Sequence, residues 1–155
     1  MQDQALTARD MMTTRLKTVR ADDRVYDAVR MLLDNGISGA PVVDENRNLI
    51  GILSEKDCTQ ALMRAVVHGL PSSLVKDVMT THVVSVPPDA HLLTVSHIFL
   101  NRPIRRIPVV EDGKLVGQIS RRDLLKHAVS VFDTAPDRTA AVLYLSAIDG
   151  RKLPT

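Results

Sequence analysis

The sequence predicts a mixed α/β (α+β) protein built from two copies of one βαββα unit. Three observations carry this prediction: the second half of the chain repeats the first, each half alternates short β-branched runs with helical apolar spacing, and each half places a polar turn between two such runs. Hydrophobic residues make up 45% of the 155 residues and charged residues 25%, which is ordinary for one globular domain with a buried core.

A shift of 67 positions aligns the two copies. Over positions 10–46, eleven residues are identical, from Asp10 and Asp77 to Val43 and Val110, where average composition would give about two or three. After a one-residue deletion in the turn 111–113 the offset becomes 66, and Asp57 aligns with Asp123. Because a stacked array needs about three or more repeats, we expect a closed pair of units. We assign residues 1–69 to the first repeat with an N-terminal segment, residues 70–132 to the second, and residues 133–155 to a helical tail.

The elements follow in the same order in both units. A short first strand is expected around Thr18 and Val19, and Asp22, repeated as Asp89, is placed to cap the helix that follows. Apolar residues at helical spacing from Val25 to Leu33 predict that helix, and Asn35 and Gly36 supply its stop. Residues 40–43 and 49–54 predict a hairpin, which residues 109–110 and 115–120 repeat. Second helices are expected to open at residues 55 and 121.

Two further features concern packing. The single Cys58 has no partner for a disulfide or for a CxxC pair, and its helical spacing with apolar neighbours predicts a core position. In the tail, apolar residues from Asp137 to Ile148 predict a helix that ends at Asp149 and Gly150 and has to bury its apolar face against this module or in a dimer.

The pattern Ser, two variable residues, Asp occurs at both strand-to-helix junctions, as Ser54 to Asp57 and Ser120 to Asp123. One interpretation is a capping box, in which each side chain satisfies a backbone N–H at the start of the helix. The other is a ligand site, because a helix N-terminus attracts phosphate and a carboxylate accepts hydrogen bonds from vicinal ribose hydroxyls. One motif can serve both purposes.

A second constellation precedes the central strand of each unit. The first copy has small residues, Gly36 to Ala40, which let a flat base approach the backbone. The second copy has Arg105 and Arg106, whose guanidinium forks match phosphate oxygens. The alternative is a solvated basic edge that discourages strand pairing.

Other chemistries lack their motifs. The chain has no P-loop, no GxGxxG fingerprint, no HExxH pair and no GxSxG elbow, and its five histidines lack zinc-ligand spacing. His82 is the one histidine that we consider as a candidate near a ligand, because it follows the repeated MetThrThr segment near a possible ligand entrance. A net charge of +2, aromatic content of 3% and no Trp argue against a nucleic-acid partner, and no apolar run is long enough for a membrane span. We therefore expect a cytoplasmic protein without a membrane or nucleic-acid partner.

The duplicated motifs resemble a tandem pair of CBS domains, or Bateman module. They read GlyIleSerGlyAlaProValValAsp and LeuIleGlyIleLeuSerGluLysAsp in the first half, and IleArgArgIleProValValGlu and LeuValGlyGlnIleSerArgArgAsp in the second. The resemblance covers about residues 8–130. It implies a pseudo-twofold module whose two clefts receive AMP, ADP, ATP, S-adenosylmethionine or a related ligand, with no required cofactor and no metal, and it favours an isologous homodimer.

Carried over position by position, the resemblance gives each candidate residue a role. Asp57 and Asp123 would hold ribose hydroxyls, with Ser54 and Ser120 beside the ribose or phosphate. Thr18 and Ser85 would lie near the ligand, and Arg105 and Arg106 would face its phosphate, whereas Ser38 departs from the basic pattern. The backbone around the remaining candidates would frame the base: Val19, Ile37, Ala40, Val86, Ile104 and Ile107. The two clefts are therefore expected to be unequal.

The function predicted is a regulatory, energy-sensing module that binds an adenine nucleotide, catalyses nothing and acts on a separate protein. The alternative is a ligand-independent dimerisation module, in which the Ser and Asp pairs are only helix caps. A nucleotide-hydrolysing enzyme is a third reading, but no arrangement of nucleophile and base is evident.

Overall fold

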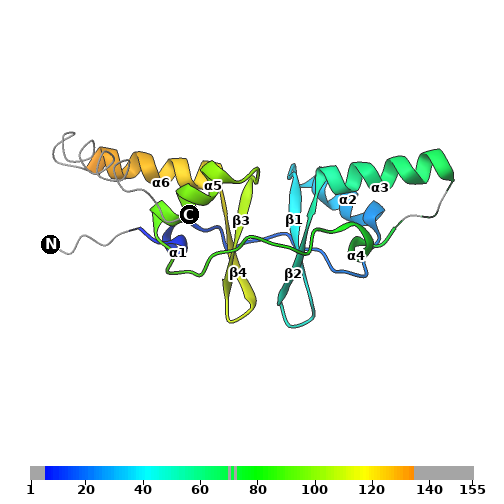
Figure 1. Cartoon of the computed structure of the whole chain (residues 1–155), viewed down its shortest axis with the longest axis horizontal. Helices are drawn as coiled ribbons and strands as arrows, with labels where there is room; N and C mark the ends of the chain where they lie inside the picture. Colours follow the sequence, from blue (N-terminus) through cyan, green and yellow to red (C-terminus); the bar gives the residue numbers. More distant parts are fainter. Residues whose placement is uncertain (1–5, 70, 72, 135–155) are drawn as a thin grey trace.

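The computed structural model describes residues 6–69, 71 and 73–134 of the chain. Two similar halves lie side by side, each with a β-hairpin and two longer helices on the same side of the molecule (Figure 1). The first half contains α2 (Val25–Asp34), β1 (Gly39–Val43), β2 (Leu49–Ser54), α3 (Glu55–His68) and α4 (Val75–Val78). The second contains α1 (Ala8–Met11), α5 (Leu92–Asn101), β3 (Arg106–Glu111), β4 (Lys114–Ser120) and α6 (Arg121–Thr134). The predicted mixed fold with two repeats is confirmed.

Each hairpin forms its own two-stranded antiparallel sheet. Pro41 pairs with Ile52 in the first and Pro108 with Gln118 in the second, and the register slips at the equivalent steps, between Val42 and Val43 and between Val109 and Val110. The expected first strand of each unit is reduced to one parallel bridge, Val19 to Val42 and Val86 to Val109. The predicted helices that open at residues 55 and 121 are confirmed.

Each half also has its own apolar core. Val25, Val42 and Leu53 are fully buried in the first, and Val95, Val109 and Ile119 in the second. The predicted core position of Cys58 is confirmed, because its side chain packs within the first core. Burial raises the pKa of its thiol, since the ionised form would lose hydration. The tail helix predicted over residues 137–148 lies outside the described residues.

The short helices that open each repeat are exchanged between the halves. Val75 of α4 is fully buried in the first core, whereas Ala8 and Met11 of α1 lie in the second. The N-terminal segment that sequence reasoning grouped with the first repeat therefore packs against the second. Residues 13–18 and 80–85 consequently cross from one half to the other, and the boundary at residues 69 and 70 stays a prediction.

This exchange explains why two predicted helix caps are wrong. The residue before α2 is Arg24 and the residue before α5 is His91, and neither Asp22 nor Asp89 caps its helix. The first N–H of each helix is satisfied by an exchanged segment, because Val25 N donates to Ser73 O at 2.8 Å and Leu92 N donates to Leu6 O at 2.9 Å. Asp22 instead pairs with Lys76 at 2.7 Å.

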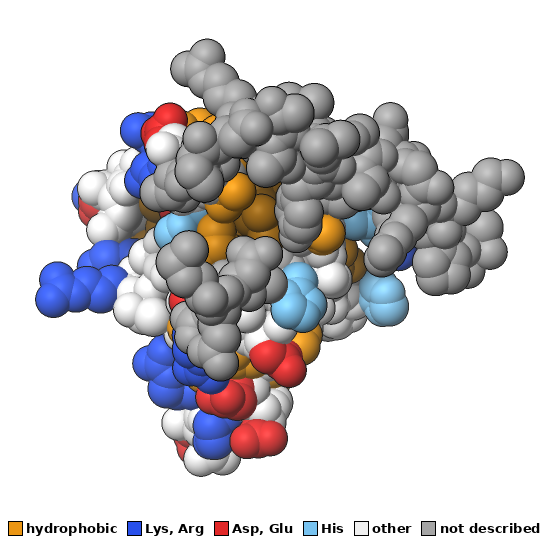
Figure 2. Space-filling view, turned by 90° about the vertical axis from the view of Figure 1, so that its left-hand side faces the viewer, with side chains coloured by type: hydrophobic (Ala, Val, Ile, Leu, Met, Phe, Trp, Pro, Cys, Tyr) orange, Lys and Arg blue, Asp and Glu red, His pale blue; other side chains and the backbone are white. Residues whose placement is uncertain are grey.

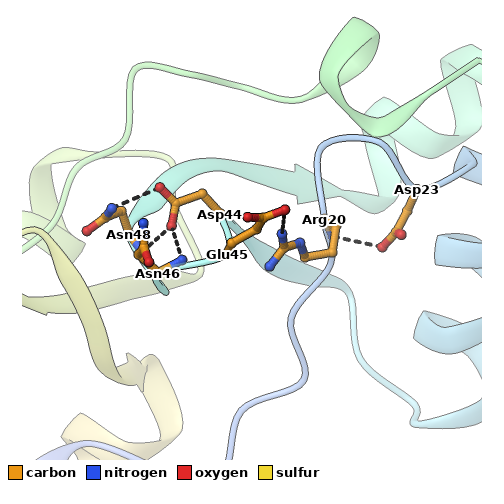
Figure 3. A network of polar contacts seen from close by, with 6 residues as sticks. All are labelled: Arg20, Asp23, Asp44, Glu45, Asn46 and Asn48. Atoms are coloured by element: carbon orange, nitrogen blue, oxygen red, sulfur yellow. Dashed lines mark hydrogen bonds and ion pairs between the residues drawn. The ribbon is translucent and has the colours of Figure 1, made fainter.

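The turns of the two hairpins are ordered and joined to each other. Asp44 accepts hydrogen bonds from the backbone of Asn46 and from the backbone and amide of Asn48, and Arg20 lies 3.8 Å from Glu45 (Figure 3). Across the halves, Leu49 N donates to Gly113 O at 3.1 Å, and residue 115 N donates to residue 47 O at 3.0 Å. These contacts fix the two sheets at their turn ends.

Candidate functional site

Both Ser-x-x-Asp motifs form capping boxes with nearly the same geometry. Oδ2 of Asp57 accepts from Ser54 N at 2.9 Å and from Ser54 Oγ at 2.6 Å, and Ser54 Oγ accepts from Asp57 N at 3.2 Å. The corresponding distances for Ser120 and Asp123 are 2.8, 2.7 and 3.2 Å. In both boxes the bonds within the described chain engage only Oδ2, so Oδ1 remains available to a ligand. Capping and ligand binding are therefore compatible here.

A cleft of about 470 Å³ lies between the halves, on the side of the sheets where β1 and β3 begin. Its volume is in the range of small-molecule sites. The first half supplies the start of β1 and the start of α3, the second supplies the turn before β3, and the crossing segment of residues 80–84 closes one side. The lining residues are Ser38, Gly39, Ala40, Ile52, Ser54, Glu55, Lys56, Asp57, Thr80, His82, Val83, Val84, Pro103, Ile104, Arg105, Arg106 and Gln118.

Arg106 reaches across this cleft from the second half to the first. Its Nη1 donates to Gly39 O, and its Nη2 donates to Ser38 Oγ at 2.8 Å. The side chain is half-buried, and burial lowers the pKa of the guanidinium from its ordinary value. Within the described chain, no carboxylate lies within ion-pair distance of it. A partly desolvated positive charge thus faces the cleft; its hydrogen-bond acceptors are neutral, and the carboxylate of Glu55 acts on it only from beyond ion-pair distance.

The remaining charges of the cleft come from both halves. Lys56 and Arg105 are exposed cations, and Glu55 and Asp57 are the carboxylates. With Arg106, the formal balance is three cations against two carboxylates. The cleft can therefore accept a ligand with a negative charge.

The sequence-based candidates were expected to be divided between two clefts, and this cleft contains part of them. Seven candidates line the cleft: Ser38, Ala40, Ser54, Asp57, Ile104, Arg105 and Arg106. The others do not line it: Thr18, Val19, Ile37, Ser85, Val86, Ile107, Ser120 and Asp123. Val19, Val86 and Ile107 have buried side chains within the two cores, so their side chains are taken up by core packing.

Sequence reasoning treated the small residues and the arginine pair as features of separate units, but the structure brings both to the same cleft as Asp57. It also adds lining residues that were not selected, including Glu55, Lys56 and Thr80. The repeated MetThrThr segment was the available signal for Thr80 and for His82, which does line the cleft. Ser120 of the Asp123 box pairs with Arg106 across β3 and β4, but neither Ser120 nor Asp123 lines this cleft.

No group of three or more His, Cys, Asp and Glu side chains in the part of the chain that the structure describes is arranged to hold a metal ion. None of the described helices is long and apolar enough to cross a membrane.

Comparison with known proteins gives consistent results. The CBS domain model matches twice, at residues 8–64 and 75–130. YlbB of Bacillus subtilis is 35% identical over 118 residues, which is 75% of this chain and 78% of YlbB. MJ1225 of Methanocaldococcus jannaschii is 28% identical over 118 residues, but these are 76% of this chain and only 41% of MJ1225.

Solved structures show the same architecture. The CBS-pair protein CBSX2 from Arabidopsis thaliana is 29% identical, with a TM-score of 0.75 over 85% of this chain and 100% of CBSX2. CBSX2 in complex with AMP is 30% identical, with a TM-score of 0.72 over 81% of this chain and 97% of that one. The chain therefore belongs to the CBS domain family, as a tandem pair of CBS domains.

Proposed function

We propose that this chain is a regulatory module that binds an anionic adenine nucleotide in the cleft between its two CBS domains. The observation that carries the proposal is Arg106, a half-buried guanidinium without a carboxylate partner in the described chain, in the same cleft as the available Oδ1 of Asp57. A buried charge is costly unless it is paired, and an anionic ligand would supply the partner. The structure of CBSX2 in complex with AMP supports the choice of nucleotide.

The polar groups of the cleft match the ribose and the phosphate of a nucleotide. Asp57 would accept hydrogen bonds from the ribose hydroxyls through Oδ1 without giving up its cap. Arg105 and Arg106 would donate to phosphate oxygens, for which their planar forks are matched. The small side chain of Ala40 leaves room for the flat base.

The same charges rank the four candidate ligands. AMP, ADP and ATP offer phosphate oxygens to the two guanidinium groups. S-adenosylmethionine has a positive sulfonium and no phosphate, so it leaves Arg106 unpaired and brings a second cation into the cleft. We expect the phosphorylated nucleotides to bind more tightly than S-adenosylmethionine.

Regulation would operate through a partner protein. A ligand shifts a conformational equilibrium only if it binds the two states with different affinity. The walls of the cleft come from both halves, so a change in the spacing between the halves would change the geometry of the site and its affinity for the ligand. We also propose that the module senses the energy state of the cell by binding AMP in competition with ATP, that it does so in the cytoplasm, and that it catalyses no reaction.

The test is calorimetric titration of ligand-stripped protein with AMP, ADP, ATP, S-adenosylmethionine and adenosine. We expect at least one phosphorylated nucleotide to bind, and we expect the Arg105→Ala, Arg106→Ala double variant to lose affinity for AMP more than for adenosine. If none of the nucleotides gives heat or a thermal shift at millimolar concentration, the ligand-independent assembly module replaces this proposal. Phosphate release that tracks the purified protein would show a hydrolase instead.

We also propose that two copies associate through the helical side of the molecule, where α2, α3, α5 and α6 lie (Figure 1). Large apolar side chains are exposed there at equivalent positions of the two repeats: Leu33 and Leu100, Met63 and Val129, and Val66 and Phe132. An exposed apolar patch of this kind marks an interaction site, and two equivalent patches suit a partner with the same pseudo-twofold symmetry. Light scattering should show a dimer, and Leu100→Asp with Val129→Asp should give a folded monomer; a wild-type monomer would contradict the proposal.

The space-filling view from the end of the second domain shows hydrophobic side chains among the charged ones on that face (Figure 2). Val129 is 55% exposed and Leu125 is 65% exposed on the outer face of α6. Large exposed apolar side chains on α6 agree with a partly apolar contact.

A further inference from the structure

Ser38 contacts two of the elements that line the cleft. Its Oγ accepts from Nη2 of Arg106 at 2.8 Å, and its carbonyl oxygen accepts from Glu55 N at 3.0 Å. Glu55 is the first residue of α3, and Asp57 lies in the same first turn. One residue is therefore bonded to the guanidinium on one side and to the turn that carries the carboxylate on the other.

The bonds of Arg106 leave it able to hold an anion. A guanidinium has five N–H donors, and Gly39 O and Ser38 Oγ take two of them. Both acceptors are neutral, so they orient the fork without cancelling its charge. The sheet requires a glycine at position 39, because a Cβ at this position would lie 2.8 Å from the carbonyl oxygen of Leu53.

The repeat shows that this arrangement is one-sided. Position 38 of the first domain corresponds to Arg105 and position 39 to Arg106. Gly39 has no side chain that could reach back toward the second domain, so the Asp123 box has no equivalent of the Arg106 bonds. Among the described residues at these two positions, the divergence therefore places a positioned cation in the cleft that contains Asp57.

We propose that Ser38 is a positioning residue that holds the guanidinium of Arg106 at a set separation from the carboxylate of Asp57, and thereby determines the preference of this cleft for a 5′-phosphorylated nucleoside over the unphosphorylated nucleoside. This inference rests on the proposed function. Ser38 acts through Arg106, and the hydroxyl supplies orientation, whereas the charge comes from the arginine. Loss of the hydroxyl frees the guanidinium to take other rotamers, so that it has to be ordered again when phosphate binds.

The experiment measures AMP and adenosine affinity for wild type, Ser38→Ala, Ser38→Thr and the control Ser96→Ala. Ser96 is also partly buried, but its hydroxyl donates only to the backbone of Leu92 within α5. We expect Ser38→Ala to weaken AMP binding about three- to tenfold, within the range for an ordinary hydrogen bond, and to leave adenosine within about twofold. Ser38→Thr keeps a hydroxyl and should restore AMP binding, and Ser96→Ala should change neither ligand.

A double-mutant cycle shows whether Ser38 acts through Arg106. Once Arg106 is alanine, Ser38→Ala should have no further effect on AMP affinity, because the group that Ser38 positions is absent. Arg106→Lys keeps the charge and an intact Ser38 but has no fork, and it should show the same loss for AMP alone. This variant provides a readout if Ser38→Ala does not fold.

Three results would overturn the inference: equal losses of AMP and adenosine affinity in Ser38→Ala, an unchanged AMP affinity in Ser38→Ala, or additive effects of the two alanine substitutions. If wild-type protein binds neither AMP nor ATP, the proposed function itself fails. That failure is visible before any variant is made, so it cannot be confused with a failure of the positioning role.

Discussion

The two capping boxes offer an internal control that separates the structural role of Asp57 from its role in ligand binding. Asp57 and Asp123 make the same three contacts with their serines, at distances that agree to within 0.1 Å. Replacement of either aspartate by alanine should therefore cost about the same stability, on the order of 1 kcal/mol for a lost cap. For a chain of this length that corresponds to a fall in Tm of roughly 2–4 °C.

Ligand binding should distinguish the two variants. Only Asp57 lies in the cleft that contains Arg105 and Arg106. Loss of charge-assisted hydrogen bonds to the ribose should weaken AMP about 10- to 100-fold in Asp57→Ala. At an AMP concentration of 100 times the wild-type Kd, the nucleotide stabilises wild-type protein by about 2.7 kcal/mol, and a 100-fold weaker variant by only about 0.4 kcal/mol.

The assay is thermal unfolding followed by circular dichroism, with and without AMP, for wild type, Asp57→Ala and Asp123→Ala. The reasoning predicts equal Tm values for the two variants without ligand and a large difference with it, Asp123→Ala keeping the wild-type shift. If Asp123→Ala loses the AMP shift and Asp57→Ala keeps it, the cleft has been assigned to the wrong domain. If both keep it, neither carboxylate holds the ribose.

Three further predictions test the fold of the first domain and its contact with the crossing segment. Gly51→Ala places a Cβ 3.0 Å from the carbonyl oxygen of Thr80. Overpacking of this kind should lower the free energy of unfolding, measured with urea, by about 1–3 kcal/mol. An unchanged midpoint of the urea unfolding curve would show that residues 80–85 are not packed against β2. Hydrogen bonds from Asn48, of which the side-chain bond has the largest effect, hold the pKa of Asp44 below its usual value. They therefore stabilise the folded state at pH values above the ordinary carboxylate pKa, and this contribution is lost as the pH falls below about 4. Asp44→Asn should flatten the acid limb of a curve of Tm against pH, and an acid limb identical to that of wild type would contradict this prediction. Burial raises the pKa of Cys58, so a thiol reagent at pH 8 should react with it only after unfolding in urea, and rapid reaction in native protein would refute the core position.

The local elements could be predicted from the sequence because their signals are local. The apolar spacing that defines α2 and the β-branched runs of the two hairpins depend on neighbours a few residues away, and the structure confirms them. The capping boxes are local for the same reason. The predicted caps at Asp22 and Asp89 were wrong because local signals do not reveal contacts with distant segments. The backbone N–H groups that these carboxylates were expected to bind are satisfied by segments about 50 or more residues away in the sequence.

The composition of the cleft depended on how the two halves pack. Equivalent positions of a closed repeat pair meet where they lie close to the pseudo-twofold axis, and the starts of β1 and β3 are such positions, since Arg106 bonds to Gly39, its own counterpart. Sequence reasoning compared positions 38–39 with 105–106 as alternatives, one small and one charged. In the structure they are complementary parts of one site.

This complementarity has a steric and an electrostatic cause. Two long arginines at both equivalent positions would compete for the same space at the axis and would repel each other, whereas two small residues would leave the cleft without a cation. A glycine opposite an arginine gives the guanidinium room and a carbonyl acceptor, and a serine beside that glycine gives it a second one. The duplicated chain therefore obtains one cation-bearing cleft because its copies differ at the axis, and a substitution that restores symmetry there, such as Arg106→Gly, should remove the preference for phosphate while both cores and both capping boxes remain intact.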